Sequence, residues 1–294
     1  MSQYRNFIET LKNIGLSSTE ARDLISKNEY FYHIAHYKKL INNNKFGGAK
    51  TNTIKYKDKN YIFYKTNDND RIIYTLNSQN KGIHNCIVIF INLNNKTVYI
   101  ETIGNNKGCV ILGKVEKGGG RKLITMALKL VTKIKDKYKL KYVYLTDNAT
   151  KTFFDNDGMS HNIKLSNLTF LTKYNTYYEK HGFIPIFEDQ GMVSIDQDII
   201  QNYLKLKKNI KKISIYDIKI NFKEFYTRIN KKYHYLIDNI KKTKENKKTQ
   251  KVKLYKFVSY YTNKKEYIPI IHELIIRIFN GNNINIPTKW GIKL

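Results

Sequence analysis

The chain has 294 residues, of which 41% are hydrophobic, so it is long and apolar enough to bury a substantial core. It carries 53 Lys and Arg against 24 Asp and Glu, a formal net charge of +29 that is spread along the chain. This composition excludes wholesale disorder, and no run approaches the roughly 18 apolar residues that a membrane span needs.

The excess of positive charge has two interpretations. An AT-rich genome would favour Lys, Asn, Ile and Tyr, whereas a polyanion partner such as nucleic acid would use the cations to release counterions. Codon bias should raise Glu as well as Lys, so the imbalance survives that correction. Cys86 and Cys109 are the only cysteines, and the first residues lack the apolar core of a signal peptide. We therefore expect a cytoplasmic protein in a reducing compartment, without membrane attachment.

Three helices are predicted before residue 50. Residues 3–14 have apolar side chains at helical spacing, Ser17 and Glu20 form a capping box for a second helix, and residues 30–41 form a third. His33 and His36 lie on the third helix without a nearby third ligand, so we predict no metal site.

From Thr53 the apolar period changes to two, which predicts a series of strands. They cover residues 53–57, 61–65, 71–76, 84–93 and 96–103. A further strand ending near Val115, a helix at residues 121–138 and a strand at 141–145 follow. This order predicts an α+β fold, with a mixed, mostly antiparallel sheet flanked by helices.

The remainder divides into an insert, a helix and a basic region. Residues 150–165 have no predicted element; Asp155, Asp157 and Gly158 lie there, but the glutamate that would complete a calcium loop is missing. Residues 168–180 are predicted as one helix.

Beyond Gly191, helices are predicted at residues 199–210, 222–240 and 269–279, with a mobile lysine-rich loop at 241–253. We therefore divide the chain into residues 1–195 and a basic, mainly helical region at 196–294. Its apolar stripes must pack on the core or on another protomer, so a homo-oligomer is one expectation.

Two motifs point to chemistry. Gly118, Gly119 and Gly120 separate a predicted strand from a predicted helix, where free amides and the helix dipole attract anions and glycines allow close approach. Relief of a tight turn is the alternative explanation of these glycines. Further on, residues 177–185 are typical of a helix end closed by Gly182 and followed by a strand.

Together the two motifs resemble those of the GCN5-related N-acetyltransferase superfamily. Gly118 and Gly120 match the loop glycines that hold the coenzyme A pyrophosphate, and Tyr178, Gly182 and Phe183 match a helix end whose tyrosine faces the thioester sulfur. Residues 165–185 are also similar to acetyltransferase-like proteins of large DNA viruses. The resemblance implies acetyl-CoA, an amine acceptor, and a coenzyme site made of Val115, Lys117, Gly118, Gly119, Gly120, Arg121, Lys122 and Asn148. It also implies that two neighbouring strands, ending near Val115 and Leu145, splay apart to admit the pantetheine arm.

The resemblance assigns Tyr178 as the acid that protonates the leaving sulfur. The base is open: Glu101, on a predicted inner strand, is the first candidate, although a solvated strand-face carboxylate is the simpler explanation of it. Glu116, Asp147 and His161 are further candidates for the base. The aromatic run around the motif, Phe170, Tyr174, Tyr177 and Tyr178, is also typical of a core.

A second hypothesis starts from a departure from the family pattern. Val115 stands where the superfamily usually has Arg or Gln, which favours a fold that has lost its activity. Such a protein would serve as a basic nucleic-acid-binding, packaging or virion component, and a viral protein would lie in the host cytoplasm or in the virion. The preferred function is an acetyl-CoA-dependent N-acetyltransferase.

Overall fold

The computed structural model of the chain describes residues 51–56, 59–68, 70–77, 85–103, 119–155, 157–246, 248 and 251–294. The helices predicted before residue 50 and the strand predicted to end near Val115 lie outside these residues. The chain divides into two compact units, Met1–Thr51 and Asn52–Leu294, and the elements described below belong to the second unit, apart from Thr51.

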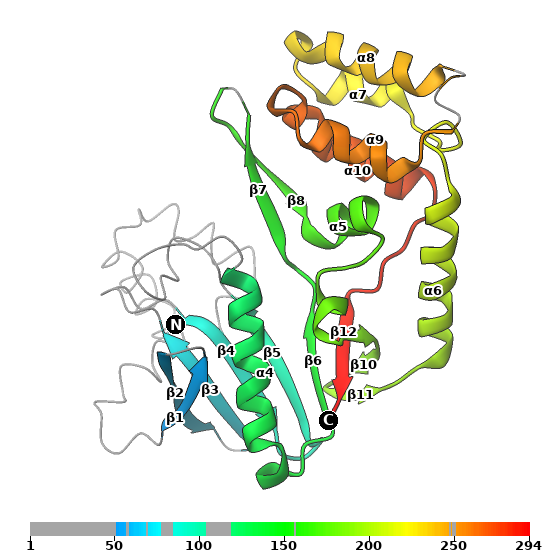
Figure 1. The fold of residues 1–294 in the computed structure, drawn as a ribbon. Helices are drawn as coiled ribbons and strands as arrows, with labels where there is room; N and C mark the ends of the chain where they lie inside the picture. The colour runs from blue at the N-terminus through cyan, green and yellow to red at the C-terminus, as the bar shows by residue number, and fades with distance from the viewer. Residues whose placement is uncertain are drawn as a thin grey trace, which may run out of the picture. The chain divides into compact units, whose positions relative to one another are not determined.

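An eight-stranded sheet forms the core, in the order β1-β2-β3-β4-β5-β6-β12-β9 (Figure 1). Its strands are β1 (Thr51–Tyr56), β2 (Lys59–Asp68), β3 (Arg71–Asn77), β4 (Asn85–Asn92), β5 (Thr97–Ile103), β6 (Tyr142–Thr146), β9 (Ile184–Pro185) and β12 (Lys289–Lys293). The β5–β6 pair is parallel, whereas the pairs from β2 to β5 and both pairs of β12 are antiparallel. The predicted α+β class with a mixed, mostly antiparallel sheet is therefore confirmed.

The neighbours of β6 differ from the prediction. We expected a strand ending near Val115 beside it, but β6 lies between β5 and β12. Its parallel partner is thus the strand that ends at Ile103. The parallel register runs from Thr97 opposite Tyr142 to Ile100 opposite Leu145.

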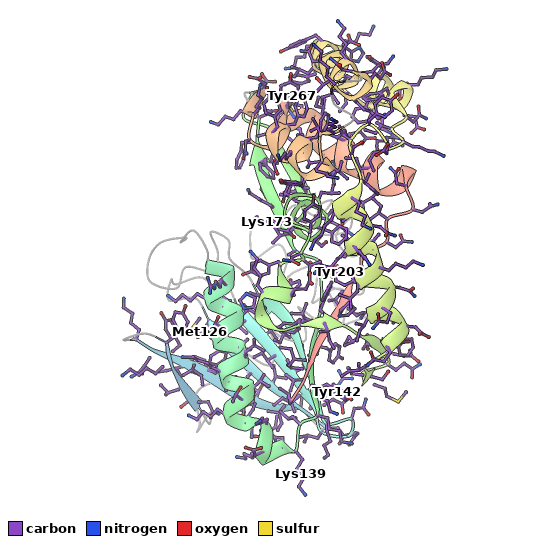
Figure 2. All side chains as sticks on the ribbon, turned by 45° about the vertical axis from the view of Figure 1, so that its right-hand side comes forward. Met126, Lys139, Tyr142, Lys173, Tyr203 and Tyr267 are labelled. Atoms are coloured by element: carbon purple, nitrogen blue, oxygen red, sulfur yellow. The ribbon has the colours of Figure 1, made fainter. Side chains whose placement is uncertain are left out.

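Helix α4 (Gly119–Tyr138) packs across β4 and β5 (Figure 1). The predicted apolar stripe of this helix is buried, as helical spacing requires. It consists of Leu123, Ala127, Leu130, Val131 and Ile134. Met126 on the same helix is also fully buried (Figure 2). Cys86 on β4 is also fully buried, and it is disulfide-bonded. We predicted a reducing compartment, in which thiols stay reduced, and the disulfide at Cys86 differs from that expectation. The cytoplasmic location itself stays a prediction.

The predicted insert at residues 150–165 forms a hairpin of β7 (Thr150–Phe154) and β8 (Ser160–Lys164). We predicted no strand there because most of these side chains are exposed, which removes the apolar alternation that marks a half-buried strand. A second short hairpin, β10 (Phe187–Asp189) and β11 (Met192–Ser194), follows β9.

Helices make up most of the remainder. They are α5 (Leu165–Lys173), α6 (Gln197–Lys212), α7 (Phe222–Arg228), α8 (His234–Glu245), α9 (Leu254–Thr262) and α10 (Ile268–Gly281), with short 3-10 turns η1 (Tyr178–His181), η2 (Lys231–Tyr233) and η4 (Lys265–Tyr267). Helix α5 packs on α9 and α10, and α6 packs on α9 and β9. The helices predicted at 199–210 and 269–279 are confirmed. None of the helices in the described part of the chain has the length and hydrophobicity to span a bilayer.

Two predicted helices are wrong in extent. The helix predicted at 168–180 ends at Tyr174, whose left-handed backbone (φ 57°) stops it, and the motif tyrosine begins a separate turn, η1. The helix predicted at 222–240 is broken at Ile229, which is extended. The apolar spacing continues across both breaks, so periodicity alone could not reveal them. The mobile loop predicted at residues 241–253 is helical at its start, because residues 241–245 belong to α8.

The C-terminal strand β12 lies inside the sheet, between β6 and β9. Trp290 on this strand is fully buried, and its Nε1 donates a hydrogen bond to the Pro287 carbonyl at 2.9 Å. Its ring packs edge-on against Tyr203 of α6 at 5.3 Å between centroids; Figure 2 marks Tyr203. The boundary proposed at residue 195 is therefore not a boundary of the sheet.

Because β12 lies inside the sheet, truncation of Trp290 should destabilise the whole protein. We expect Trp290→Ala to lower the free energy of unfolding by roughly 3–5 kcal/mol, because it leaves a large cavity. Urea unfolding followed by circular dichroism measures this, with Lys293→Ala on the exposed end of the strand as control. Equal midpoints for the two variants would contradict the central position of β12.

Candidate active site

The tyrosine motif lies against the first turn of α4. A methyl group on Gly120 would stand 3.3 Å from the Tyr177 hydroxyl oxygen, so the glycine lets this phenol come close to the helix. Burial raises the pKa of Tyr177, and the positive charge of Arg121 opposes that rise. Burial, then the charges of Arg121 and Lys180, lower the pKa of His181. Two motifs separated by some sixty residues of sequence thus meet at one helix end, where Tyr177, the neighbour of the predicted Tyr178, lies beside Gly120.

The first turn of α4 suits an anion. It contains no acidic residue, and Arg121 is exposed there. Lys122 has a different environment, because its ammonium lies 5.1 Å from the Tyr61 ring centroid and 5.9 Å from that of Tyr56. Of the two predicted basic residues, Arg121 is therefore the better placed to meet a phosphate.

Asp147 follows β6 and is buried, with 3% of its surface exposed. Its Oδ1 accepts a hydrogen bond from the Ala149 amide at 3.3 Å, while its Oδ2 has no hydrogen-bond partner. Burial raises the pKa of this carboxyl to about 6, although the Ala149 amide, the Ser166 hydroxyl and the Lys164 charge oppose the rise. A carboxylate with this pKa, and with one oxygen unpaired, is suited to accept a proton near neutral pH.

Tyr178 is the first residue of η1 and a near neighbour of Asp147. Its side chain belongs to the core, with its ring edge-on to Tyr177 at 5.4 Å and 6.0 Å from Phe183. Burial, then the negative charge of Asp147, raise the pKa of its phenol. The hydroxyl therefore keeps its proton at neutral pH. Gly182, in the left-handed region at φ 84°, ends the turn and confirms the predicted glycine closure.

The Glu179 carboxylate fixes this turn to its surroundings. Oε2 accepts hydrogen bonds from the Thr176 amide at 2.7 Å and from the Tyr203 hydroxyl at 2.6 Å. Oε1 pairs with the Lys207 ammonium at 2.6 Å. The same ammonium also donates to the side-chain oxygen Oδ1 of Asn175 at 2.7 Å. Helix α6 thus holds η1 through Glu179 and holds the segment before it through Asn175. Sequence reasoning missed Glu179, since nothing in its spacing connects it with α6.

The other predicted coenzyme residues are only partly described. Val115, Lys117 and Gly118 lie outside the described residues, and so does the candidate base Glu116. Gly119 is the first residue of α4. Asn148 is exposed after β6, and its amide donates to the Thr146 carbonyl at 3.1 Å.

Glu101 lies in an irregularity of β5. The register of β5 with β4 shifts between the pairs Ile100–Ile89 and Thr102–Val88, so Glu101 is the extra residue of a β-bulge. Its side chain is half-buried. The negative charge of Asp147 acts on the motif tyrosine, so Asp147 is the candidate base that the structure places near Tyr178.

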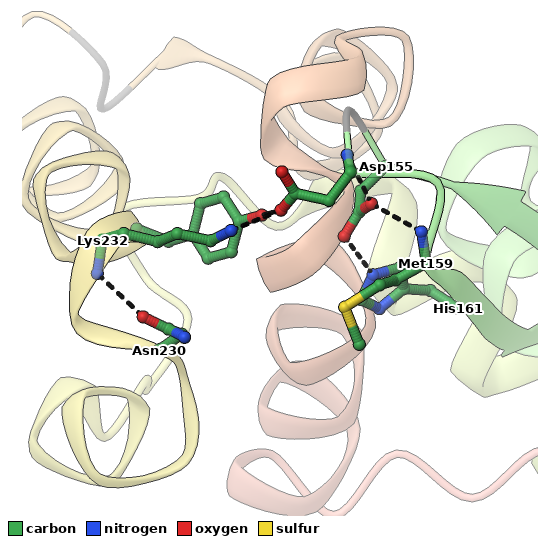
Figure 3. Close-up of polar contacts among 7 residues, drawn as sticks. Asp155, Met159, His161, Asn230 and Lys232 are labelled. Carbon is green, nitrogen blue, oxygen red and sulfur yellow. Dashed lines mark hydrogen bonds and ion pairs between the residues drawn. The ribbon is translucent and has the colours of Figure 1, made fainter.

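His161 belongs to a different cluster at the end of the β7–β8 hairpin (Figure 3). Its Nε2 is 3.0 Å from Asp155 Oδ2, and Asp155 Oδ1 accepts from the amides of Asp157 and Met159 at 2.9 Å each. The bond to His161 is the main cause of the lowered pKa of Asp155. Asp157 in turn pairs with Lys232 and Tyr233 of η2. His161 therefore helps to hold the hairpin against η2, and its contacts do not suggest a base.

Comparisons of this chain with protein-family models, with curated proteins and with solved structures each find no match. Within the described ranges, no group of three His, Cys, Asp or Glu side chains could hold a metal ion.

The Glu179 contacts make a first prediction about this site. Glu179→Gln removes the charge that Lys207 and Tyr203 share, and we expect it to lower the free energy of unfolding by about 2 kcal/mol. Thermal unfolding measures the loss, with Glu245→Gln on exposed α8 as the matched control. The interpretation fails if the two variants unfold at the same temperature.

A second prediction concerns Asp147 and pH. Because its pKa is higher in the folded than in the unfolded state, the folded protein loses stability as pH rises from about 4 to about 6. Asp147→Asn removes this loss, so we expect it to be more stable than the parent by roughly 2–3 kcal/mol above pH 7 and equal to it below pH 4. Chemical unfolding at each pH measures the difference, with Asp136→Asn on the exposed face of α4 as control. A difference that does not grow with pH would refute the buried, proton-binding environment.

Proposed function

We propose that this chain is an acetyl-CoA-dependent N-acetyltransferase with a fold like that of the GCN5-related superfamily. One observation carries the proposal: Tyr177 lies against the first turn of α4 and packs on Tyr178, and the Tyr178 phenol lies within the electrostatic influence of Asp147, whose Oδ2 has no hydrogen-bond partner. An anion-binding helix end, a protonated phenol and a buried base are what acyl transfer to an amine requires.

The sheet supports the same proposal. In the described strands, the parallel pairs of β5 and β6 stop at Ile100 and Leu145, where β5 bulges at Glu101 and continues beside β4. Asp147 lies two residues beyond Leu145. A ligand arm entering where the two strands part would therefore reach the region of Asp147 and Tyr178.

The residues present suit a coenzyme diphosphate. The first amides of α4, the exposed Arg121 and the absence of acids in that turn all favour two phosphates. Coenzyme A would be held there by the first-turn amides and by Arg121. When bound, acetyl-CoA supplies an acetyl thioester, whose carbonyl carbon an amine can attack and whose sulfur can leave.

Two side chains of the protein then transfer the protons. Asp147 accepts a proton from the ammonium of the acceptor, directly or through a water, and so leaves the nitrogen with a free electron pair. Tyr178 gives its proton to the departing sulfur, and it has kept that proton because burial and Asp147 raise its pKa. Once bonded to the acetyl carbon, the same nitrogen loses a second proton, which restores the Tyr178 phenol, while the proton on Asp147 passes to solvent. Each turnover therefore releases one proton.

The proposal is tested first by binding. We expect acetyl-CoA at a hundredfold excess over its Kd to stabilise the protein by about 2.7 kcal/mol, seen as a higher melting temperature. Arg121→Gln should weaken binding by roughly tenfold. Lys122→Gln, which removes a cation that lies over tyrosine rings, is the matched control and should bind normally. No thermal shift at millimolar acetyl-CoA would refute the proposal.

Activity is tested with acetyl-CoA and a panel of amines: a lysine-rich polypeptide, a polyamine, an aminoglycoside and an amino sugar nucleotide. Release of free thiol measures turnover. Tyr178→Phe and Asp147→Asn should each lower kcat by 10²-fold or more, and loss of Asp147 should remove the acidic limb of the pH profile, near pH 6. Tyr235→Phe, an exposed tyrosine on α8, should leave turnover unchanged. Full activity of both site variants would exclude the assigned roles.

A further inference from the structure

A second feature lies away from α4, where the end of α6 meets the segment before α9. The two stretches run antiparallel: the Ile215 amide donates to the Val252 carbonyl at 3.1 Å, and the Leu254 amide donates to the Ile213 carbonyl at 3.2 Å. The Lys253 ammonium donates to the Lys212 carbonyl at 3.0 Å, and the Lys244 ammonium of α8 donates to the Tyr216 carbonyl at 3.2 Å. Three separate parts of the chain thus meet in one place, which we call the lysine junction.

The lysine junction concentrates positive charge. It is formed by Lys211, Lys212, Lys244, Lys251 and Lys253, of which all but the half-buried Lys244 are exposed. Ion pairs among the described residues engage none of Lys211, Lys212, Lys251 and Lys253. The acidic side chains on these stretches are Asp217, which accepts from Ser214, and the exposed Glu245.

A helix end explains only part of this charge. Lys211 and Lys212 lie in the last turn of α6, where the dipole favours cations. Lys253 reaches the same helix end from another segment, and Lys244 and Lys251 add two more charges close by. The surrounding region, residues 197–293, has 23 Lys and Arg against 7 Asp and Glu. The carboxyl end of one helix does not need so many cations, which favours an external polyanion.

An exposed aromatic ring lies among the lysines. Tyr216 is 39% exposed, and the Lys244 ammonium is 6.0 Å from its ring centroid. Cations that follow a backbone, together with an exposed ring on which a base can stack, are the combination used by proteins that bind single-stranded nucleic acid. An acidic polypeptide or a sulfated sugar would use the lysines but not the face of the ring.

We propose that the lysine junction binds single-stranded nucleic acid, with the lysines on successive phosphates and a base stacked on Tyr216. This inference is independent of acetyl transfer, since it uses none of the residues around α4. It would also account for part of the excess positive charge of the chain, as charge that binds nucleic acid.

The test is fluorescence anisotropy of the full chain with a labelled 20-nucleotide oligothymidine, at several salt concentrations. Replacing Lys211, Lys212, Lys251 and Lys253 by Gln should weaken binding at low salt by tenfold or more, and should reduce the slope of log K against log salt by roughly 0.7 for each lost phosphate contact. The control replaces four exposed lysines elsewhere, Lys59, Lys137, Lys141 and Lys293, and so has the same net charge. Replacing the four junction lysines by Arg should keep the affinity and the slope, because Arg keeps the positive charges that meet the phosphates.

Stacking is tested separately at Tyr216. Tyr216→Ala should lower affinity for the oligonucleotide by about fivefold or more, whereas Tyr216→Phe, which keeps the ring, should bind like the parent. Heparin as a competitor separates the contribution of the lysine charges from that of base stacking, because the affinity for heparin should not change in Tyr216→Ala. Equal binding by the junction and control quadruple variants would overturn the site. An equal loss of heparin and oligonucleotide binding in Tyr216→Ala would overturn the choice of nucleic acid. Acetyl-CoA thermal shifts in the quadruple variant should match the parent, so the two proposals can fail separately.

Discussion

The position of η1 depends on one carboxylate. Glu179 collects the Thr176 amide, the Tyr203 hydroxyl and the Lys207 ammonium, so it joins the turn that begins with Tyr178 to the side of α6. Tyr203 in turn packs against Trp290 and Phe170, which places the same helix against the sheet and α5. A partly buried carboxylate with this many donors is well satisfied, and its removal would leave each donor without a partner. Because this network fixes the turn that carries the Tyr178 phenol, it keeps that phenol near Asp147.

The sheet strands from Arg71 to Leu145 and helix α4 could be predicted from the sequence, because a period of two or of 3.6 is strong where one face is buried. The resemblance assigned the glycine loop and the tyrosine motif to one coenzyme site, but the contact of Gly120 with Tyr177 was not predicted. The raised pKa of Asp147 was not, since it comes from burial by residues distant in the sequence. The β7–β8 hairpin was missed because its strands are largely exposed, and the pairing of Asp155 with His161 could not be foreseen without it. Periodicity also continued across Tyr174 and Ile229, where the backbone in fact leaves the helix.

The positive charge of this chain does not act in one way throughout. Lys207 neutralises a partly buried carboxylate, Lys122 lies over tyrosine rings, and Lys129 and Lys133 donate to carbonyls of β1. Each of these lysines has a structural partner within the chain. The lysines at the end of α6 also have contacts within the chain, since Lys211 lies over the Tyr174 ring and Lys253 donates to the Lys212 carbonyl. They differ in that they come from separate segments and remain exposed together. Composition counts all of these cations alike, whereas their surroundings separate the ones that stabilise the fold from those that can meet a ligand.

The position of β12 has a consequence for how the chain reaches this structure. Trp290 and its register partner Leu145 are 145 residues apart, and the helices from α5 to α10 lie between them in the chain. Ordering so long a loop is entropically expensive, although the cost grows only slowly with length, and pairings of this kind slow folding. During synthesis, one edge of β6 would stay unpaired until β12 has left the ribosome. A chaperone, or early packing of the helices against one another, would shield that edge in the meantime.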